Sequence, residues 1–97
     1  MSVSVSTHVL DVEQGRPAAG VAVELYSGDQ RVGGGATDGD GRISALASDL
    51  DPGVYRLVFA PSSPFFRRVE LALALEDGHY HVPLLVSSFS CTTYRGS

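Results

Sequence analysis

The segment His79-Tyr80-His81-Val82-Pro83-Leu84-Leu85-Val86 alternates two kinds of side chain: Tyr80 and every second residue after it are aromatic or aliphatic, and both histidines occupy the alternate positions. A period of two is typical of a half-buried β-strand, because successive side chains point to opposite faces. We therefore predict a strand that buries its apolar face and places His79 and His81 on the other face. After Ser87-Ser88 the pattern predicts a further strand, from Phe89 to Tyr94.

The same alternation recurs along the chain, in segments 3–9, 21–26, 54–59 and 65–75. Residues typical of turns separate these segments, at 15–17, 27–29, 38–41, 51–53 and 76–78. Short strands divided in this way predict an all-β fold, an antiparallel β-sandwich. Because no linker or repeat interrupts the pattern, residues 1–97 are expected to form a single domain. The run Gly33-Gly34-Gly35 predicts a local distortion of a strand.

The composition narrows the class of function. The formal net charge is −4, which argues against a nucleic-acid partner because such binding relies on basic side chains that neutralise phosphates. No apolar run is long enough to cross a membrane, and the N-terminus lacks the features of a signal peptide, so a cytoplasmic protein with no membrane partner is expected. The single Cys91 lies in an apolar stretch and is predicted to be a packed side chain.

Three histidines and one arginine are candidates for chemistry. His8 and His81 are each out of phase with the aliphatic residues of their strands, and either one alone would be an ordinary solvent-exposed histidine on an outer face. His79, beside a turn, is expected to be exposed at its strand end. Arg42 follows a turn, 38–41, that resembles part of a calcium loop but lacks the later bidentate glutamate. Two histidines without further ligands at suitable spacing do not predict a zinc site.

The chain contains motifs near both ends and one in the middle that together resemble those of one protein family. These are Ser6-Thr7-His8-Val9-Leu10-Asp11 followed by Gly15-Arg16-Pro17-Ala18-Ala19-Gly20-Val21, then Asp40-Gly41-Arg42, His79-Tyr80-His81-Val82-Pro83-Leu84-Leu85 and Thr93-Tyr94-Arg95-Gly96-Ser97. Together they resemble the motifs of the 5-hydroxyisourate hydrolases, the transthyretin-like enzymes of urate breakdown. The resemblance runs in register from about Val5 to Ser97.

The resemblance implies a transthyretin-like (prealbumin-like) sandwich of two four-stranded sheets, with a short helix between the fifth and sixth strands. In this chain only residues 60–64 are available for that helix, and they include Pro61 and Pro64. Proline opposes helix formation, so the helix is expected to be absent. The resemblance also implies a homotetramer, a dimer of dimers, with the active sites at the contact between dimers.

The implied activity is hydrolysis of 5-hydroxyisourate to 2-oxo-4-hydroxy-4-carboxy-5-ureidoimidazoline, without a metal or an organic cofactor. By resemblance the catalytic residues are His8, Arg42 and His81, and the substrate-binding residues are Tyr94, Arg95, Gly96 and Ser97. The histidines would activate water and shuttle its proton, in roles not yet divided between them. Arg42 would stabilise the oxyanion, Arg95 would anchor the terminus, and Ser97, through its hydroxyl and carboxylate, would position the heterocycle.

Two other classes of function are kept open. Segments 20–25, 36–42 and 50–57 also resemble generic transthyretin-related sandwich repeats, which would make the chain a non-catalytic binding module. A hormone carrier like transthyretin is a third possibility. Both alternatives would dispense with the two histidines and the Tyr-Arg-Gly-Ser segment, so the presence of that set favours the hydrolase.

Overall fold

The protein is described by a computed structural model that covers residues 2–96. Its strands are β1 (Val3–Asp11), β2 (Arg16–Pro17), β3 (Ala22–Ser27), β4 (Gln30–Ala36), β5 (Arg42–Leu50), β6 (Gly53–Ala60), β7 (Val69–Leu75), β8 (Gly78–Val86) and β9 (Cys91–Thr93). Residues 2–96 contain no helix, as expected for the proline-containing segment 60–64. It follows that no helix in this part of the chain could span a membrane.

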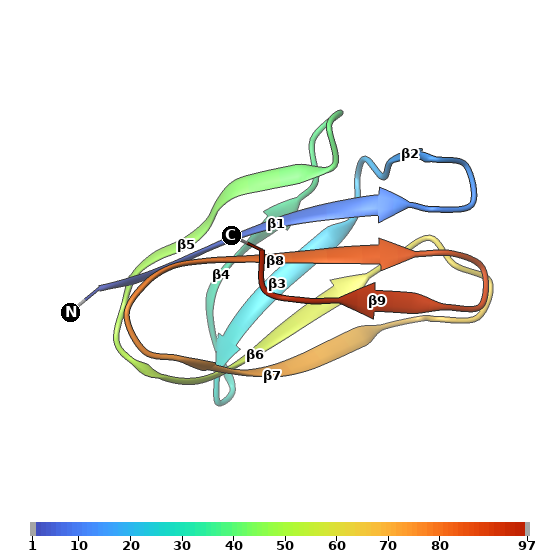
Figure 1. Ribbon diagram of the computed structural model, residues 1–97. Helices are drawn as coiled ribbons and strands as arrows, with labels where there is room; N and C mark the ends of the chain where they lie inside the picture. The colour runs from blue at the N-terminus through green and yellow to red at the C-terminus, as the bar shows by residue number, and fades with distance from the viewer. Residues whose placement is uncertain (1, 97) are drawn as a thin grey trace.

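The strands form two layers, so the predicted sandwich is confirmed (Figure 1). The first sheet has the order β2-β1-β8-β9, with β5 also paired to β1, and the second sheet has the order β4-β3-β6-β7. Two details differ from the expectation of two four-stranded antiparallel sheets. The first sheet gains the two-residue strand β2, and β1 pairs with β8 in parallel. Parallel neighbours need a long crossover connection, which here consists of all the strands between them.

The core lies between the inner faces of the two sheets. Its fully buried side chains include Val3, Val5 and Val9 of β1, Val23 and Leu25 of β3, Leu57 and Phe59 of β6, and Leu84 of β8. The alternation in the sequence therefore predicted the buried face correctly on these strands. Burial of this apolar surface is the main favourable contribution to folding, and it leaves the alternate residues of β1 and β8 on the outer face.

Three local expectations were wrong. Residues 65–68 are not part of a strand, because the Ser63 hydroxyl accepts hydrogen bonds from the backbone N–H groups of Phe65 (3.2 Å) and Phe66 (3.0 Å) and holds a turn there. The last strand is limited to Cys91–Thr93. Cys91 is exposed rather than packed, because this short strand lies at the edge of the first sheet.

The glycine run distorts β4, as predicted. The pairing of β3 with β4 shifts register after Leu25, which pairs with Gly33, whereas Tyr26 pairs with Arg31. At Gly33 the backbone of β5 comes so close that an added Cβ would overlap the carbonyl oxygen of Leu46 and lie 2.7 Å from the Cβ of Ala47. A residue without a side chain is therefore needed where β4 crosses β5.

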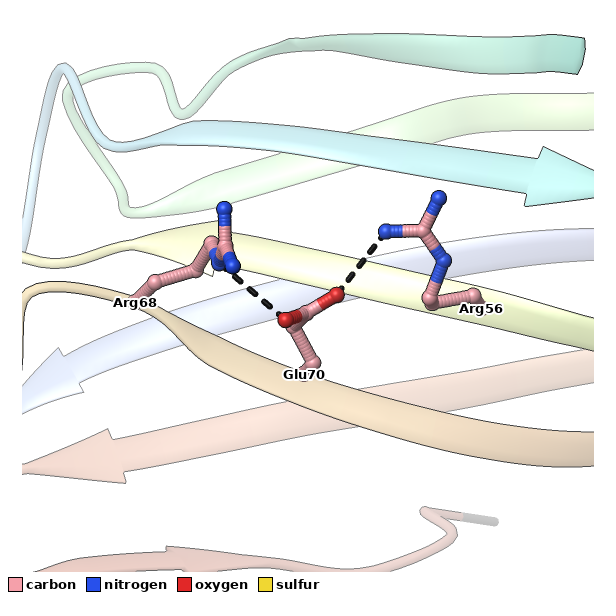
Figure 2. Close-up of polar contacts among 3 residues, drawn as sticks. All are labelled: Arg56, Arg68 and Glu70. Carbon is pink, nitrogen blue, oxygen red and sulfur yellow. Dashed lines mark hydrogen bonds and ion pairs between the residues drawn. The ribbon is translucent and has the colours of Figure 1, made fainter. Parts of the chain in front are cut away.

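The outer face of the second sheet carries an ionic cluster, shown in Figure 2. The Glu70 carboxylate of β7 accepts a hydrogen bond from Arg56 of β6 (2.8 Å) and forms an ion pair with Arg68 (3.1 Å). The hydrogen bond from Arg56 lowers the pKa of Glu70, with both arginine charges adding to the effect. Because these ion pairs are solvent-exposed, they stabilise the fold little. They lie on a different sheet from the histidines.

Candidate functional site

Strand pairing in the first sheet gathers polar side chains from three distant segments on its outer face. In the parallel pairing of β1 with β8, Ser4 is level with His79 and Ser6 is level with His81. On the other side of β1, His8 is paired with Arg42 of β5. The sheet therefore brings His8, Arg42 and His81 to one face, and Figure 1 shows the β5, β1 and β8 ribbons lying side by side.

A tight turn before β5 sets the position of Arg42. The Asp38 carboxylate accepts hydrogen bonds from the backbone N–H groups of Asp40 (2.9 Å) and Arg42 (3.0 Å). Both hydrogen bonds lower the pKa of Asp38, and the one from the Arg42 N–H has the larger effect. Gly41 has a φ of +75°, a conformation that favours glycine, and an added Cβ there would overlap the Val9 carbonyl oxygen. The turn thus fixes where β5 and its first side chain begin.

The same turn orients His8. The Nε2 atom of His8 lies 2.9 Å from the backbone carbonyl oxygen of Asp40. A carbonyl can only accept a hydrogen bond, so His8 must carry a proton on Nε2. In its neutral form His8 therefore has Nδ1 as an acceptor.

His81 is held on two sides. Its Nδ1 atom lies 2.8 Å from the Ser6 hydroxyl, and its backbone carbonyl accepts a hydrogen bond from the Gly96 N–H at 2.6 Å. Within residues 2–96 its Nε2 atom has no hydrogen-bond partner. Partial burial lowers the pKa of His81 from its usual value of 6.5, and the neighbouring His8, Arg42 and His79 lower it further. At neutral pH the imidazole is consequently uncharged and able to accept a proton.

Sequence reasoning missed Ser4 and Ser6 as residues of this site, and with them the contacts of His79. His79 is exposed as expected, but its Nε2 lies 2.8 Å from the Ser6 hydroxyl and its Nδ1 lies 2.7 Å from the Ser4 hydroxyl. The spacing of Ser4, Ser6 and His8 indicates that they share one face of β1. Their pairing with β8 could not be found from that spacing, because the partners lie 75 residues apart along the chain.

A hollow of about 190 Å³ opens on this face. It is lined by Ser6, Thr7, Arg42, Ser44, His79 and His81. Larger hollows lie elsewhere, including one of about 450 Å³ between β7 and the β8–β9 side. That one is lined mainly by β7 and has no histidine, whereas the smaller hollow combines imidazoles, a guanidinium and hydroxyls. We therefore place the candidate active site in the smaller hollow.

The chain after β9 divides the remaining candidate residues between the two hollows. Gly96 pairs with His81 and lies so close to it that an added Cβ would be 2.7 Å from the His81 ring carbon Cδ2. Tyr94 and Arg95 instead line the larger hollow, and the Arg95 guanidinium stacks on the Tyr80 ring at 4.1 Å. The structure does not bring these two side chains to the imidazole rings of His8, His79 or His81, although the Arg95 guanidinium reaches the backbone carbonyl of His79. Ser97 lies outside the described residues.

Comparison with known proteins agrees with this fold. A model of the HIUase/Transthyretin family matches residues 5–96. A 5-hydroxyisourate hydrolase of Deinococcus radiodurans is 41% identical, over 95% of this chain and 94% of the relative. The structure of the Klebsiella pneumoniae 5-hydroxyisourate hydrolase superposes with a TM-score of 0.88 at 31% identity, over 98% of this chain and 99% of the other.

A longer relative contains the same unit. The uric acid degradation bifunctional protein TTL of Arabidopsis thaliana is 42% identical over 96% of this chain, which spans only 37% of that protein. The two-layer sandwich and its similarity to the Klebsiella pneumoniae structure make the protein transthyretin-like. The family model narrows this class, because it matches residues 5–96, nearly all of the chain. The chain belongs to the HIUase/transthyretin family, as its motifs predicted.

Proposed function

We propose that this chain hydrolyses 5-hydroxyisourate to 2-oxo-4-hydroxy-4-carboxy-5-ureidoimidazoline. The observation that carries the proposal is the meeting of His8, Arg42 and His81 on the outer face of the first sheet. A non-catalytic binding module or a hormone carrier would not need these two imidazoles and a guanidinium on one face of a sheet. The relatives named above that carry the name 5-hydroxyisourate hydrolase support the same choice.

His81 is proposed as the general base. Its lowered pKa keeps it neutral, and its Nδ1 is engaged by Ser6, which leaves Nε2 to take a proton from water. The resulting hydroxide adds to the ring carbonyl of the substrate, and the acyl–nitrogen bond of the six-membered ring then breaks. The proton returns from His81 to the departing nitrogen, so that one water is consumed and the enzyme regains its starting state.

Arg42 and His8 have separate proposed roles. Arg42 carries a permanent positive charge at the rim of the hollow and is proposed to stabilise the oxyanion that forms when hydroxide adds to the carbonyl. His8 donates from Nε2 to Asp40, so its Nδ1 is proposed to accept a hydrogen bond from the attacking water or from a ring N–H of the substrate. No step requires a metal or an organic cofactor.

The Tyr94–Ser97 segment is proposed to complete the substrate site. Gly96 supports this role because its backbone lies against the His81 ring. Arg95 is proposed to hold the segment in place through its stacking on Tyr80 and its long hydrogen bond, 3.4 Å, to the carbonyl of His79. A binding role for Ser97 and a cytoplasmic location remain predictions from the sequence.

We also propose a homotetramer, a dimer of dimers that meets through the outer face of the first sheet. The hollow on one chain, about 190 Å³, is smaller than ligand pockets of roughly 300–1,000 Å³. A second chain stacked on this face would deepen the hollow and exclude water from it. Sedimentation velocity tests the proposal: a tetramer supports it, whereas an active monomer contradicts it.

An absorbance time course tests the activity. Urate is oxidised by a urate oxidase until 5-hydroxyisourate accumulates, the protein is added, and the decay of the intermediate is followed. Decay that accelerates in proportion to the protein supports the proposal, and decay at the spontaneous rate contradicts it. His81→Ala should remove most of the acceleration, on the order of 10²-fold or more for loss of a general base. Arg68→Gln, on the other sheet, is the control and should be fully active.

A further inference from the structure

A continuous chain of hydrogen bonds links His81 to the rim of the first sheet. It runs from His81 Nδ1 to the Ser6 hydroxyl (2.8 Å), from that hydroxyl to His79 Nε2 (2.8 Å), and from His79 Nδ1 to the Ser4 hydroxyl (2.7 Å). Serines of β1 and histidines of β8 alternate along it because the two strands run parallel with these residues level. His81, at one end of the chain, is half-buried, whereas His79, next to Ser4 at the other end, is exposed.

We propose that Ser6 and His79 are positioning residues that relay a proton: the chain Ser4–His79–Ser6–His81 orients the His81 imidazole and carries positive charge from His81 to His79 during hydrolysis. The inference rests on the hydrolytic function proposed above. It adds two residues that act on the substrate through His81.

The proton balance follows from the donors and acceptors. Before reaction, neutral His81 donates from Nδ1 to Ser6, Ser6 donates to Nε2 of neutral His79, and His79 donates from Nδ1 to Ser4. When Nε2 of His81 takes a proton from water, the Nδ1 proton moves to Ser6 as the Ser6 proton moves to His79. His81 is then neutral with its proton on Nε2, and His79 is the imidazolium. The reverse shift restores His81 as its Nε2 proton passes to the leaving nitrogen.

The surroundings favour charge on His79 over charge on His81. His81 is partly buried and faces His8 from β1 and Arg42 from β5, and these surroundings disfavour its charged form. His79 is exposed to solvent, and the Ser4 hydroxyl can accept the hydrogen bond from its Nδ1–H in both the neutral and the charged form. The nearest charged side chain of the last segment, Arg95, donates to the backbone carbonyl of His79 rather than to its ring.

Ser6 is the link whose removal breaks the relay with least disturbance. Ser6→Ala should lower kcat roughly 10-fold with little change in KM, because the base remains but is less well oriented and cannot pass its charge on. Ser6→Thr keeps the hydroxyl and should recover most of the rate. Ser48→Ala, an exposed serine of β5, is the control for loss of a hydroxyl.

His79 separates orientation from proton transfer. In His79→Gln the side-chain amide can still hydrogen-bond to Ser6, but it cannot take up a proton. We expect His79→Gln to lower kcat to a similar extent as Ser6→Ala while His81 keeps the orientation it has in the wild type. Nitrogen-15 NMR of the histidine rings supplies the readout that a structural role would not change: the proton on Nδ1 of His81 should be retained in His79→Gln and lost in Ser6→Ala.

The outcomes distinguish the relay from the function on which it rests. If the wild-type protein leaves the spontaneous decay unchanged, the hydrolytic function is wrong and the relay falls with it. If the wild type is active and both Ser6→Ala and His79→Gln retain its kcat within twofold, the relay alone is overturned. A His81 ring whose proton stays on Nδ1 in Ser6→Ala would also overturn the orienting role of Ser6.

Discussion

The backbone of Gly96 rests against the imidazole of His81: its N–H donates to the His81 carbonyl at 2.6 Å, and its α-carbon leaves no room for a side chain. An added Cβ would lie 2.7 Å from the His81 ring carbon Cδ2. Because Ser6 holds the opposite side of the ring, the imidazole is fixed between β1 and the last segment of the chain. The segment after β9 thus acts on the geometry of the proposed base directly.

Gly96→Ala tests this contact. The methyl group should push the His81 ring away from its position and lower kcat/KM by on the order of 10-fold, because small misplacements of a catalytic group are costly. The melting temperature should change little, since Gly96 lies outside the core. The steady-state rate with 5-hydroxyisourate and a thermal melt are the measurements.

Gly39→Ala is the matched control for this substitution. Gly39 lies in the turn before β5, and an added Cβ there would meet nothing within 4 Å. It should keep the wild-type rate. A Gly96→Ala protein as active as Gly39→Ala would show that the close contact does not orient His81.

The pH dependence of activity follows from the lowered pKa of His81. Burial, and then the neighbouring His8, Arg42 and His79, place that pKa below 6.5. The base is therefore neutral at pH 7, and kcat/KM should fall only on the acid side of 6.5. Arg42→Gln removes one of these charges, so the acid limb of its residual activity should move up toward 6.5. Arg68→Gln should leave the limb in place, and an unmoved limb in Arg42→Gln would contradict the assignment.

The lowered pKa of His81 should also make the stability of the fold depend on pH. The unfolded chain takes a proton on His81 near its usual value of 6.5, whereas the folded protein resists that proton until the pH is lower. The unfolded state therefore binds more protons between these two values, and the free energy of unfolding falls as the pH falls through this range. Urea unfolding at pH values on both sides of 6.5 measures the effect, and His81→Ala should reduce it.

The sequence predicted the faces of the strands well and their neighbours less well. Alternation placed Val5 in the core and His8 outside it because both properties are local to one strand. The parallel pairing that sets Ser6 beside His81 depends on a contact 75 residues apart, which no local pattern encodes. The prediction of an exposed His79 was correct as to exposure, but its two serine contacts depend on that same pairing.

The motifs predicted the family but did not show how its residues divide in space. Tyr94 and Arg95 stand beside Gly96 in the sequence, yet their side chains line the larger hollow next to β7. The reason is the stacking of Arg95 on Tyr80, whose ring lies on the opposite face of β8 from His81. Residues that are contiguous in the sequence therefore lie on both faces of β8.

Thr37→Val should destabilise the fold. The buried Thr37 hydroxyl donates to the Ala18 carbonyl at 2.7 Å and accepts from the Val21 N–H at 2.9 Å, which ties the loop before β3 to the end of β4. Valine has nearly the same shape but leaves both backbone groups without this partner. The expected loss is about 1–3 kcal/mol, measured from the midpoint of urea unfolding.

Thr92→Val is the control for Thr37→Val, because Thr92 is exposed on β9. It should shift the midpoint little. The slope of the transition should be the same for both variants and the wild type, since the surface exposed on unfolding does not change. Equal midpoints for the two variants would show that the buried hydroxyl contributes nothing to stability.

The crossing of β4 over β5 supplies the last prediction. At Gly33 an added methyl group would overlap the backbone of Leu46 and the side chain of Ala47, whereas at Gly35 the nearest atom, in Ile43, is 4.0 Å away. Gly33→Ala should therefore cost about 1–3 kcal/mol through overpacking. Gly35→Ala should be neutral or stabilise the protein by up to about 1 kcal/mol, because alanine restricts the unfolded chain. Chemical unfolding of the two variants side by side decides the matter: equal stabilities would mean that the two sheets can separate at this crossing without cost.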